Sequence, residues 1–263
     1  MRTEVTIFPF LILLLSCNRN SDSVLRLVPV ELQTNFNFEP ISDATGFIGE
    51  FEGKYYLITC YHVLTGRESY DTTVTKVPDL PLPNKVSVYF HPKDGKEFII
   101  KDFDLMNLKG ERLFYTYHTF RYSNYPNYTI DAAILPIEIS DSDILIHPID
   151  ISNLDTTWNV GENQKLLVYG YPGLIDNKRV KSDIITVYRS TLGDSTYSGN
   201  VVMAITTDNL EGASGSPTYL IDRDKTIFIG MACGQDFFRP DTELILVFQW
   251  IRRLLNLKLK GHA

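Results

Sequence analysis

Residues 209–217 read Asn-Leu-Glu-Gly-Ala-Ser-Gly-Ser-Pro, a run of small residues between two β-rich stretches. One interpretation is a surface turn, because Gly, Ser and Pro each favour turns. The other is a nucleophile turn, in which the flanking glycines let backbone N–H groups approach a substrate at Ser214 without a Cβ in the way. A serine hydroxyl becomes reactive only when a base takes its proton and donors hold the resulting oxyanion. The second interpretation therefore requires a histidine and an aspartate elsewhere in the chain.

Two residues beside apolar segments meet this requirement. His62 directly follows an apolar stretch that ends in Ile58-Thr59-Cys60, whereas the other four histidines lie in polar or Pro-flanked segments or at the chain end. Asp131 begins the apolar segment 131–135, and a buried carboxylate there needs a partner such as a histidine N–H. Taken alone, His62 is better explained as a structural histidine. A functional interpretation therefore needs His62, Asp131 and Ser214 together.

The segments around these residues resemble the trypsin-like (chymotrypsin-fold) serine peptidase family. Residues 57–64, Leu-Ile-Thr-Cys-Tyr-His-Val-Leu, resemble its L-T-A-A-H segment, and residues 131–135, Asp-Ala-Ala-Ile-Leu, resemble its D-I-A-L-L segment. Residues 212–217, Gly-Ala-Ser-Gly-Ser-Pro, resemble G-D-S-G-G-P, and more closely the G-N-S-G-S-P of bacterial glutamyl endopeptidases. The order His, Asp, Ser also matches this family and differs from the order in α/β-hydrolases.

This resemblance implies an all-β chain of two six-stranded antiparallel β-barrels, with the active site in the cleft between them. Ser214 from the second barrel would attack a carbonyl, and His62 from the first would take its proton and later return it. Asp131 would fix the imidazole tautomer, and the N–H groups of Gly212 and Ser214 would form the oxyanion hole. Ala213 stands where many animal members carry an Asp that pairs with a newly cleaved N-terminus. We therefore expect a site that forms directly on folding.

The resemblance also suggests substrate-binding residues. Asp208 lies where trypsin itself has the base of its primary pocket, which would favour Lys or Arg, although a turn cap is the preferred interpretation of Asp208. Ala232 occupies the position of a histidine in glutamyl endopeptidases, so a preference for Glu loses support. Ala232, Cys233 and Gly234 remain candidate pocket walls, and the Tyr-rich segment 115–128 is a candidate for another wall.

Composition limits the remaining function classes. The chain has 263 residues, 44% of them hydrophobic, which is enough for a substantial core. Its net charge of −7 argues against a nucleic-acid groove, which would need clustered Lys and Arg. The sequence shows no metal-ligand cluster and no phosphate-binding glycine loop, so we expect no metal and no cofactor. The expected partner is a protein or peptide substrate.

The N-terminus predicts export. Residues 1–4 precede an apolar run from Val5 to Leu15, whose 11 residues fit a signal-peptide core and fall short of the about 20 that a membrane-spanning helix needs. Residues 14–17, Leu-Leu-Ser-Cys, resemble the bacterial lipoprotein signal, in which the cysteine is lipidated. An ordinary secretory signal cleaved nearby is the alternative. The lipoprotein interpretation predicts a protein anchored at Cys17 in the bacterial envelope, in the periplasm or at the cell surface, with no other membrane contact.

Three cysteines are too few for a disulfide framework. Without Cys17, Cys60 and Cys233 remain. We expect two unpaired, mostly buried thiols, while sequence alone leaves a disulfide between them open.

Many short strand patterns separated by turns, followed by one helical pattern, predict the domain organisation. Residues 45–51 and 55–60 around a turn at 52–54 predict a β-hairpin. Apolar residues between Leu244 and Leu255 recur at helical spacing and predict a C-terminal α-helix. The expected parts are a signal peptide (1–17), a polar tether and N-terminal arm (18–40), the first barrel (41–138), a crossover (139–152), the second barrel (153–240) and the helix (241–263).

The sequence thus predicts an exported serine endopeptidase. A non-catalytic binding or signalling module on the same fold, and an esterase-like acyl hydrolase with the same triad, are the alternatives.

Overall fold

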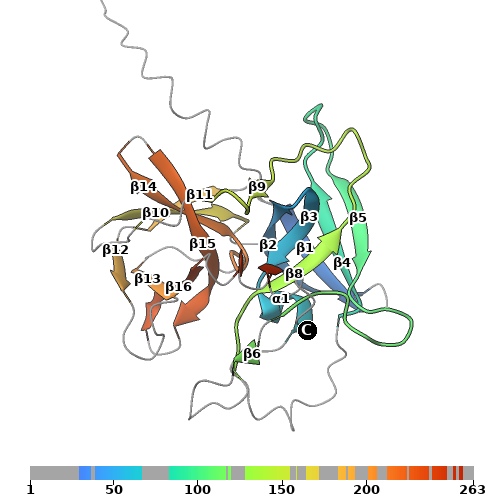
Figure 1. Cartoon of the computed structure of the whole chain (residues 1–263), viewed down its shortest axis with the longest axis horizontal. Helices are drawn as coiled ribbons and strands as arrows, with labels where there is room; N and C mark the ends of the chain where they lie inside the picture. Colours follow the sequence, from blue (N-terminus) through green and yellow to red (C-terminus); the bar gives the residue numbers. More distant parts are fainter. Residues whose placement is uncertain are drawn as a thin grey trace, which may run out of the picture.

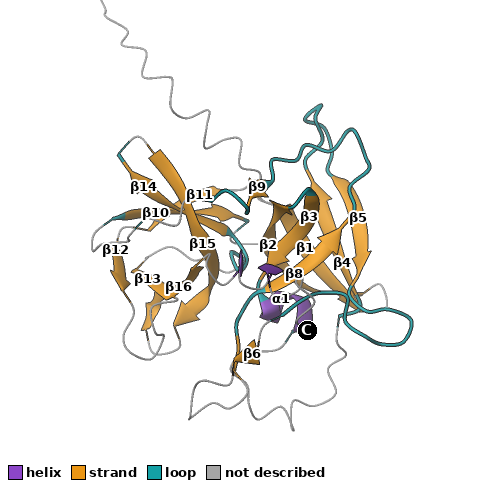
Figure 2. Ribbon diagram, in the orientation of Figure 1, coloured by secondary structure: helices purple, strands orange, loops and turns teal. Residues whose placement is uncertain are grey.

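The described part of the chain consists mainly of β-strands arranged in two large sheets (Figure 1, Figure 2). Within that part, no helix has the length and apolar character needed to span a membrane. The computed structural model describes residues 30–36, 39–66, 83–116, 118–119, 128–154, 158, 164–171, 183–187, 189–192, 201–205, 212–223, 225–236, 239–247, 251–252 and 255–256.

The first sheet has the strand order β5-β4-β1-β2-β3-β8, with antiparallel pairing throughout and the short β9 added parallel to β2. The predicted hairpin is confirmed as β2 and β3, joined through Glu52 and Gly53, which both have positive φ. The bounds are β1 Val30–Phe36, β2 Glu39–Phe51, β3 Lys54–Thr59, β4 Lys85–Phe90, β5 Ile99–Asp104, β8 Ala133–Ile137 and β9 Ile149–Asp150, with a separate pair β6 His118–Thr119 and β7 Tyr128–Thr129.

The second sheet has the order β11-β10-β14-β15-β16-β13-β12 and is also antiparallel. Its two end strands, β11 and β12, follow each other in the chain with one residue between them. Because these two edge strands are consecutive in the chain, the sheet must curl so that its two edges come close together. The bounds are β10 Lys165–Gly170, β11 Asp183–Val187, β12 Arg189–Leu192, β13 Val201–Ile205, β14 Pro217–Asp222, β15 Lys225–Asp236 and β16 Arg239–Val247.

The C-terminal segment corrects the sequence prediction of a helix over 241–263. Residues up to Val247 form strand β16, which pairs with β15 on one side and β13 on the other. A continuous apolar run such as 244–247 is compatible with a strand as well as with a helix, and the two cannot be distinguished by spacing over so few residues. Of the described residues after Val247, 251–252 and 255–256 are helical, and Ile251 and Leu255 are buried about one helical turn apart.

The N-terminal boundary of the first sheet also differs from the expectation. Strand β1 lies within residues 18–40, which the sequence assigned to a polar tether and arm. Val30, Leu32 and Thr34 are buried in alternation, as expected for a strand with one face on a core. This strand joins β2 to β4, so it belongs to the centre of the sheet.

One hydrophobic core runs through both sheets. Phe47 of β2 packs edge-to-face on Phe228 of β15, with ring centroids 5.5 Å apart, and Phe228 packs in turn on Tyr219 of β14. A second contact joins His91, after β4, to Tyr171, after β10, with 2.6 Å between Nε2 and the hydroxyl. Burial lowers the pKa of His91, which favours the neutral ring in this contact. The shared core holds the segments between the sheets in fixed positions.

Candidate active site

His62 lies in a one-turn helix, α1 (Tyr61–Thr65), directly after the buried strand β3. The helix ends at Gly66, whose positive φ of 63° allows its N–H to donate to the His62 carbonyl at 2.7 Å. Tyr61, Val63 and Leu64 are buried, so the backbone of His62 is fixed by its neighbours. The His62 side chain itself stays partly accessible, at 27% exposure.

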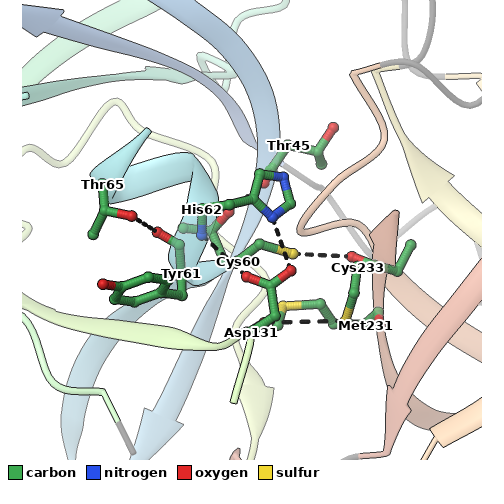
Figure 3. Close-up of polar contacts among 10 residues, drawn as sticks. Thr45, Cys60, Tyr61, His62, Thr65, Asp131, Met231 and Cys233 are labelled. Carbon is green, nitrogen blue, oxygen red and sulfur yellow. Dashed lines mark hydrogen bonds and ion pairs between the residues drawn. The ribbon is translucent and has the colours of Figure 1, made fainter. Parts of the chain in front are cut away.

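Asp131 accepts two hydrogen bonds from His62. The backbone N–H of His62 donates to Oδ1 at 3.0 Å, and ring Nδ1 lies 2.8 Å from Oδ2 (Figure 3). An ionised carboxylate can only accept, so Nδ1 carries the proton in this pair and Nε2 of a neutral ring is left as the basic nitrogen. The Asp131 side chain is 14% exposed and lies between the buried residues Ile130 and Ala132. The predicted pairing of His62 with Asp131 is present in the structure.

The turn that carries Ser214 is tied to both sheets through Thr45 of β2. The Thr45 N–H donates to the Ser214 carbonyl at 3.1 Å, and the Thr45 hydroxyl donates to the Gly212 carbonyl at 2.9 Å. The same hydroxyl accepts a hydrogen bond from the Tyr171 N–H, also at 2.9 Å. On the other side, the Gly215 N–H donates to the Ala232 carbonyl of β15 at 2.8 Å. Sequence reasoning placed Thr45 only in a strand and did not identify this role.

Gly215 occupies the tightest point of the turn. Its φ is +90°, and a Cβ at this position would lie 2.0 Å from the Thr45 carbonyl oxygen and 2.3 Å from the Thr59 hydroxyl. The carbonyl belongs to backbone, which cannot move away without disturbing the β1–β2 pairing, in which Thr45 lies opposite Glu31. A glycine is therefore required where the turn passes the first sheet.

We expect Gly215→Ala to lower the free energy of unfolding by about 2–4 kcal/mol, because it combines an unfavourable φ with a backbone clash. Chemical denaturation followed by fluorescence measures the change. Gly53→Ala is the matched control: Gly53 also has a positive φ, of 74°, but a Cβ there meets nothing within 4 Å. Equal losses for the two variants would contradict the packing role of Gly215.

The other predicted site residues that the structure describes lie in the turn at 212–217 and on β15. Within the described residues, the Ser214 hydroxyl makes no hydrogen bond, and the amides of Gly212 and Ser214 donate none to the protein. Ala232 is buried on β15, and Cys233 and Gly234 follow it half-buried at an irregularity of the strand. Asp208 and Cys17 lie outside the described residues.

Cys60 and Cys233 form no disulfide in the described part of the chain, as expected, with Cys60 buried and Cys233 half-buried. The Cys60 thiol donates to the Ala232 carbonyl at 3.2 Å, which joins the end of β3 to β15. The sulfur of Cys233 lies 3.5 Å from the Met231 carbonyl and 4.0 Å from the Asp131 carbonyl.

Comparison with known proteins shows similarity at the level of structure. Neither the protein-family models nor the curated protein sequences contain a match. Among solved structures, a serine endoprotease from Yersinia pestis matches with a TM-score of 0.53 and 11% identity, over 92% of this chain and 67% of that one. The protease Anisep from Arthrobacter nicotinovorans matches with a TM-score of 0.53 and 10% identity, over 89% and 95% of the two chains.

The chain has the chymotrypsin fold. The predicted all-β class is confirmed. The two predicted six-stranded barrels correspond to two curled, mainly antiparallel sheets, each with seven strands among the described residues. A further match is an inactivated protease paralogue of the scabies mite, with a TM-score of 0.52 and 15% identity, over 90% of this chain and 96% of that one. The chymotrypsin fold is therefore shared by proteases and by at least one protein described as inactivated.

Proposed function

We propose that this protein is a serine endopeptidase that hydrolyses peptide bonds with Ser214, His62 and Asp131. The observation that carries the proposal is the double hydrogen bond from His62 to the Asp131 carboxylate, which leaves Nε2 as the base. The backbone bond fixes the position of the carboxylate, and the ring bond fixes the orientation and tautomer of the imidazole. In a chymotrypsin fold, this arrangement next to a Gly-Ala-Ser-Gly turn supports acyl transfer through serine.

In the proposed reaction, Nε2 of His62 takes the proton of the Ser214 hydroxyl as the oxygen attacks the substrate carbonyl. Asp131 stabilises the resulting imidazolium, and His62 then returns the proton to the leaving amine. The free amides of Gly212 and Ser214 are the donors proposed for the oxyanion. Catalytic hydrogen bonds are often long in unliganded enzymes and shorten when substrate binds, so the unbonded Ser214 hydroxyl is compatible with this role.

A fluorophosphonate probe tests the proposal directly, because it labels only serines that a neighbouring base activates. We expect stoichiometric labelling of the folded chain, with the adduct mapped by mass spectrometry to Ser214, and no labelling after denaturation. A folded chain that stays unlabelled would favour the second candidate, a non-catalytic module. The observation that supports a non-catalytic module is the structural match to an inactivated protease paralogue.

For specificity, we propose that Ala232, Cys233 and Gly234 of β15 form one wall of the substrate pocket. The turn at 212–217 supports a relation to bacterial endopeptidases, while Ala232 offers no cation to hold a glutamate side chain. For Asp208 we propose a role as a turn cap, in preference to one at the base of the pocket. A peptide library with a small-ester control would define the preferred residue and exclude an esterase.

We propose that the protein is exported and lipid-anchored at Cys17, on the basis of its N-terminal sequence. The Cys17→Ser variant should then appear in the soluble fraction of cells from which the wild-type chain is recovered with membranes. Membrane retention of the variant would contradict the anchor.

A further inference from the structure

Cys60, Asp131 and Cys233 form a compact cluster beside His62 (Figure 3). One ligand atom from each residue lies within 4.8 Å of the other two, and this is the one such group of three among the described residues. Cys60 follows β3, Asp131 precedes β8 and Cys233 lies on β15, so both sheets contribute. The sequence predicted no metal-ligand cluster because these residues are far apart in the chain.

We propose that this cluster binds a thiophilic divalent metal ion of the Zn²⁺ class, with the two thiolates and one Asp131 carboxylate oxygen as ligands. Two sulfurs and a carboxylate suit Zn²⁺, which binds Cys, His and Asp or Glu in tetrahedral sites. Bonds of about 2.3 Å to sulfur and about 2.1 Å to oxygen place tetrahedral ligand atoms roughly 3.5–3.8 Å apart. The cluster needs to contract by about 1 Å at its widest separation to reach this geometry.

The surroundings of the cluster favour such an ion. Cys60 is fully buried and the Asp131 side chain nearly so, whereas the half-buried Cys233 gives access from solvent. The Cys60 thiol donates to the Ala232 carbonyl at 3.2 Å, and the Cys233 sulfur lies 3.5 Å from the Met231 carbonyl and 4.0 Å from the Asp131 carbonyl. Hydrogen bonds of this kind are weak, so a metal–sulfur bond can replace them at small cost. On binding, each thiol releases its proton to solvent. Two thiolates and a carboxylate then compensate the charge of +2, and a water completes the tetrahedron.

Binding at this cluster is coupled to His62 because both use the same carboxylate. The oxygens of Asp131 accept the backbone and ring N–H groups of His62. An ion that draws on one of these oxygens weakens its hydrogen bond to His62 and loosens the imidazole. The ion would therefore inhibit hydrolysis, a consequence that rests on the proposed function, whereas binding itself does not.

Titration of the reduced full chain with Co²⁺, in place of Zn²⁺, tests the site without any measurement of activity. We expect a sulfur-to-cobalt charge-transfer absorption that saturates at one ion per chain. Cys60→Ala and Cys233→Ala should each abolish it. Cys17→Ala, which removes the third cysteine of the chain, should leave it unchanged. Asp131→Asn should keep a sulfur signal but weaken Co²⁺ binding by more than tenfold, because even outer-shell changes cost about 10–100-fold in metal affinity.

Three results would overturn the site: no charge-transfer band in the folded, reduced wild type, a band that survives both cysteine substitutions, or a band that disappears with Cys17→Ala. If Cys60→Ala fails to fold, the half-buried Cys233 still decides the question. Fluorophosphonate labelling of the metal-free chain separates the two proposals. A chain that binds Co²⁺ but is never labelled retains the metal site and loses the endopeptidase.

Discussion

Ser214→Ala is expected to reduce kcat for peptide hydrolysis by about 10⁶-fold, the loss typical when the nucleophile of a serine protease is removed. The variant retains His62, Asp131 and both proposed oxyanion donors, but no oxygen is left to attack the carbonyl. A small residual rate over water should persist through the oxyanion hole and substrate positioning. Hydrolysis of a peptide amide substrate, chosen from a library, measures the effect.

Ser216→Ala is the matched control for this variant. Ser216 lies two residues further along, is fully buried, and its hydroxyl has no partner among the described residues. Its removal should leave kcat within a fewfold of wild type. Both variants should unfold at nearly the wild-type denaturant concentration, because neither hydroxyl is hydrogen-bonded within the described structure. Undiminished hydrolysis by folded Ser214→Ala would rule out Ser214 as the nucleophile.

Asp131→Asn is expected to lower kcat by about 10⁴-fold with little change in KM. The substituted side chain can still accept from the His62 backbone N–H, but an amide NH₂ then faces Nδ1. Nδ1 must become the acceptor, which moves the ring proton to Nε2. A protonated Nε2 cannot take the proton of Ser214, so the nucleophile is not activated.

The control for Asp131→Asn is Asp104→Asn, the same change at an exposed carboxylate whose nearest cation, Lys85, is 4.0 Å away. This variant should hydrolyse peptides at the wild-type rate. Fluorophosphonate labelling should be slow in Asp131→Asn and normal in Asp104→Asn. A loss smaller than about tenfold for Asp131→Asn would mean that the tautomer of His62 does not limit the reaction.

The sequence predicts correctly those features that depend on residues close together in the chain. The hairpin of β2 and β3 was readable from strand residues around a turn, and His62 and Asp131 were found because each stands beside an apolar run. The strand at 239–247 was missed because short apolar runs fit a buried strand and a helix equally well. Strand β1 is not predicted, because residues 18–40 are assigned to a polar tether and N-terminal arm. The polar residues of β1 alternate with apolar ones, which is also typical of a strand.

Features that depend on tertiary contact were beyond the sequence. Thr45 is an ordinary strand residue until the fold brings Gly212 and Tyr171 to its side chain. Likewise, the sequence gives no sign that Cys60 and Cys233 lie near each other. The packing of β15 against the end of β3 brings both of them close to Asp131. In both cases the partners come from different sheets, and no spacing along the chain encodes the distance between them.

The contacts of Thr45 have a consequence for how the molecule matures. Because Thr45 of the first half holds the turn at 212–217 of the second, the turn gains its full set of hydrogen bonds only when both halves are packed together. A chain in which only one half has folded would lack these hydrogen bonds, and on the proposed function its Ser214 would not be positioned for attack. Docking of the two halves would then complete the proposed site.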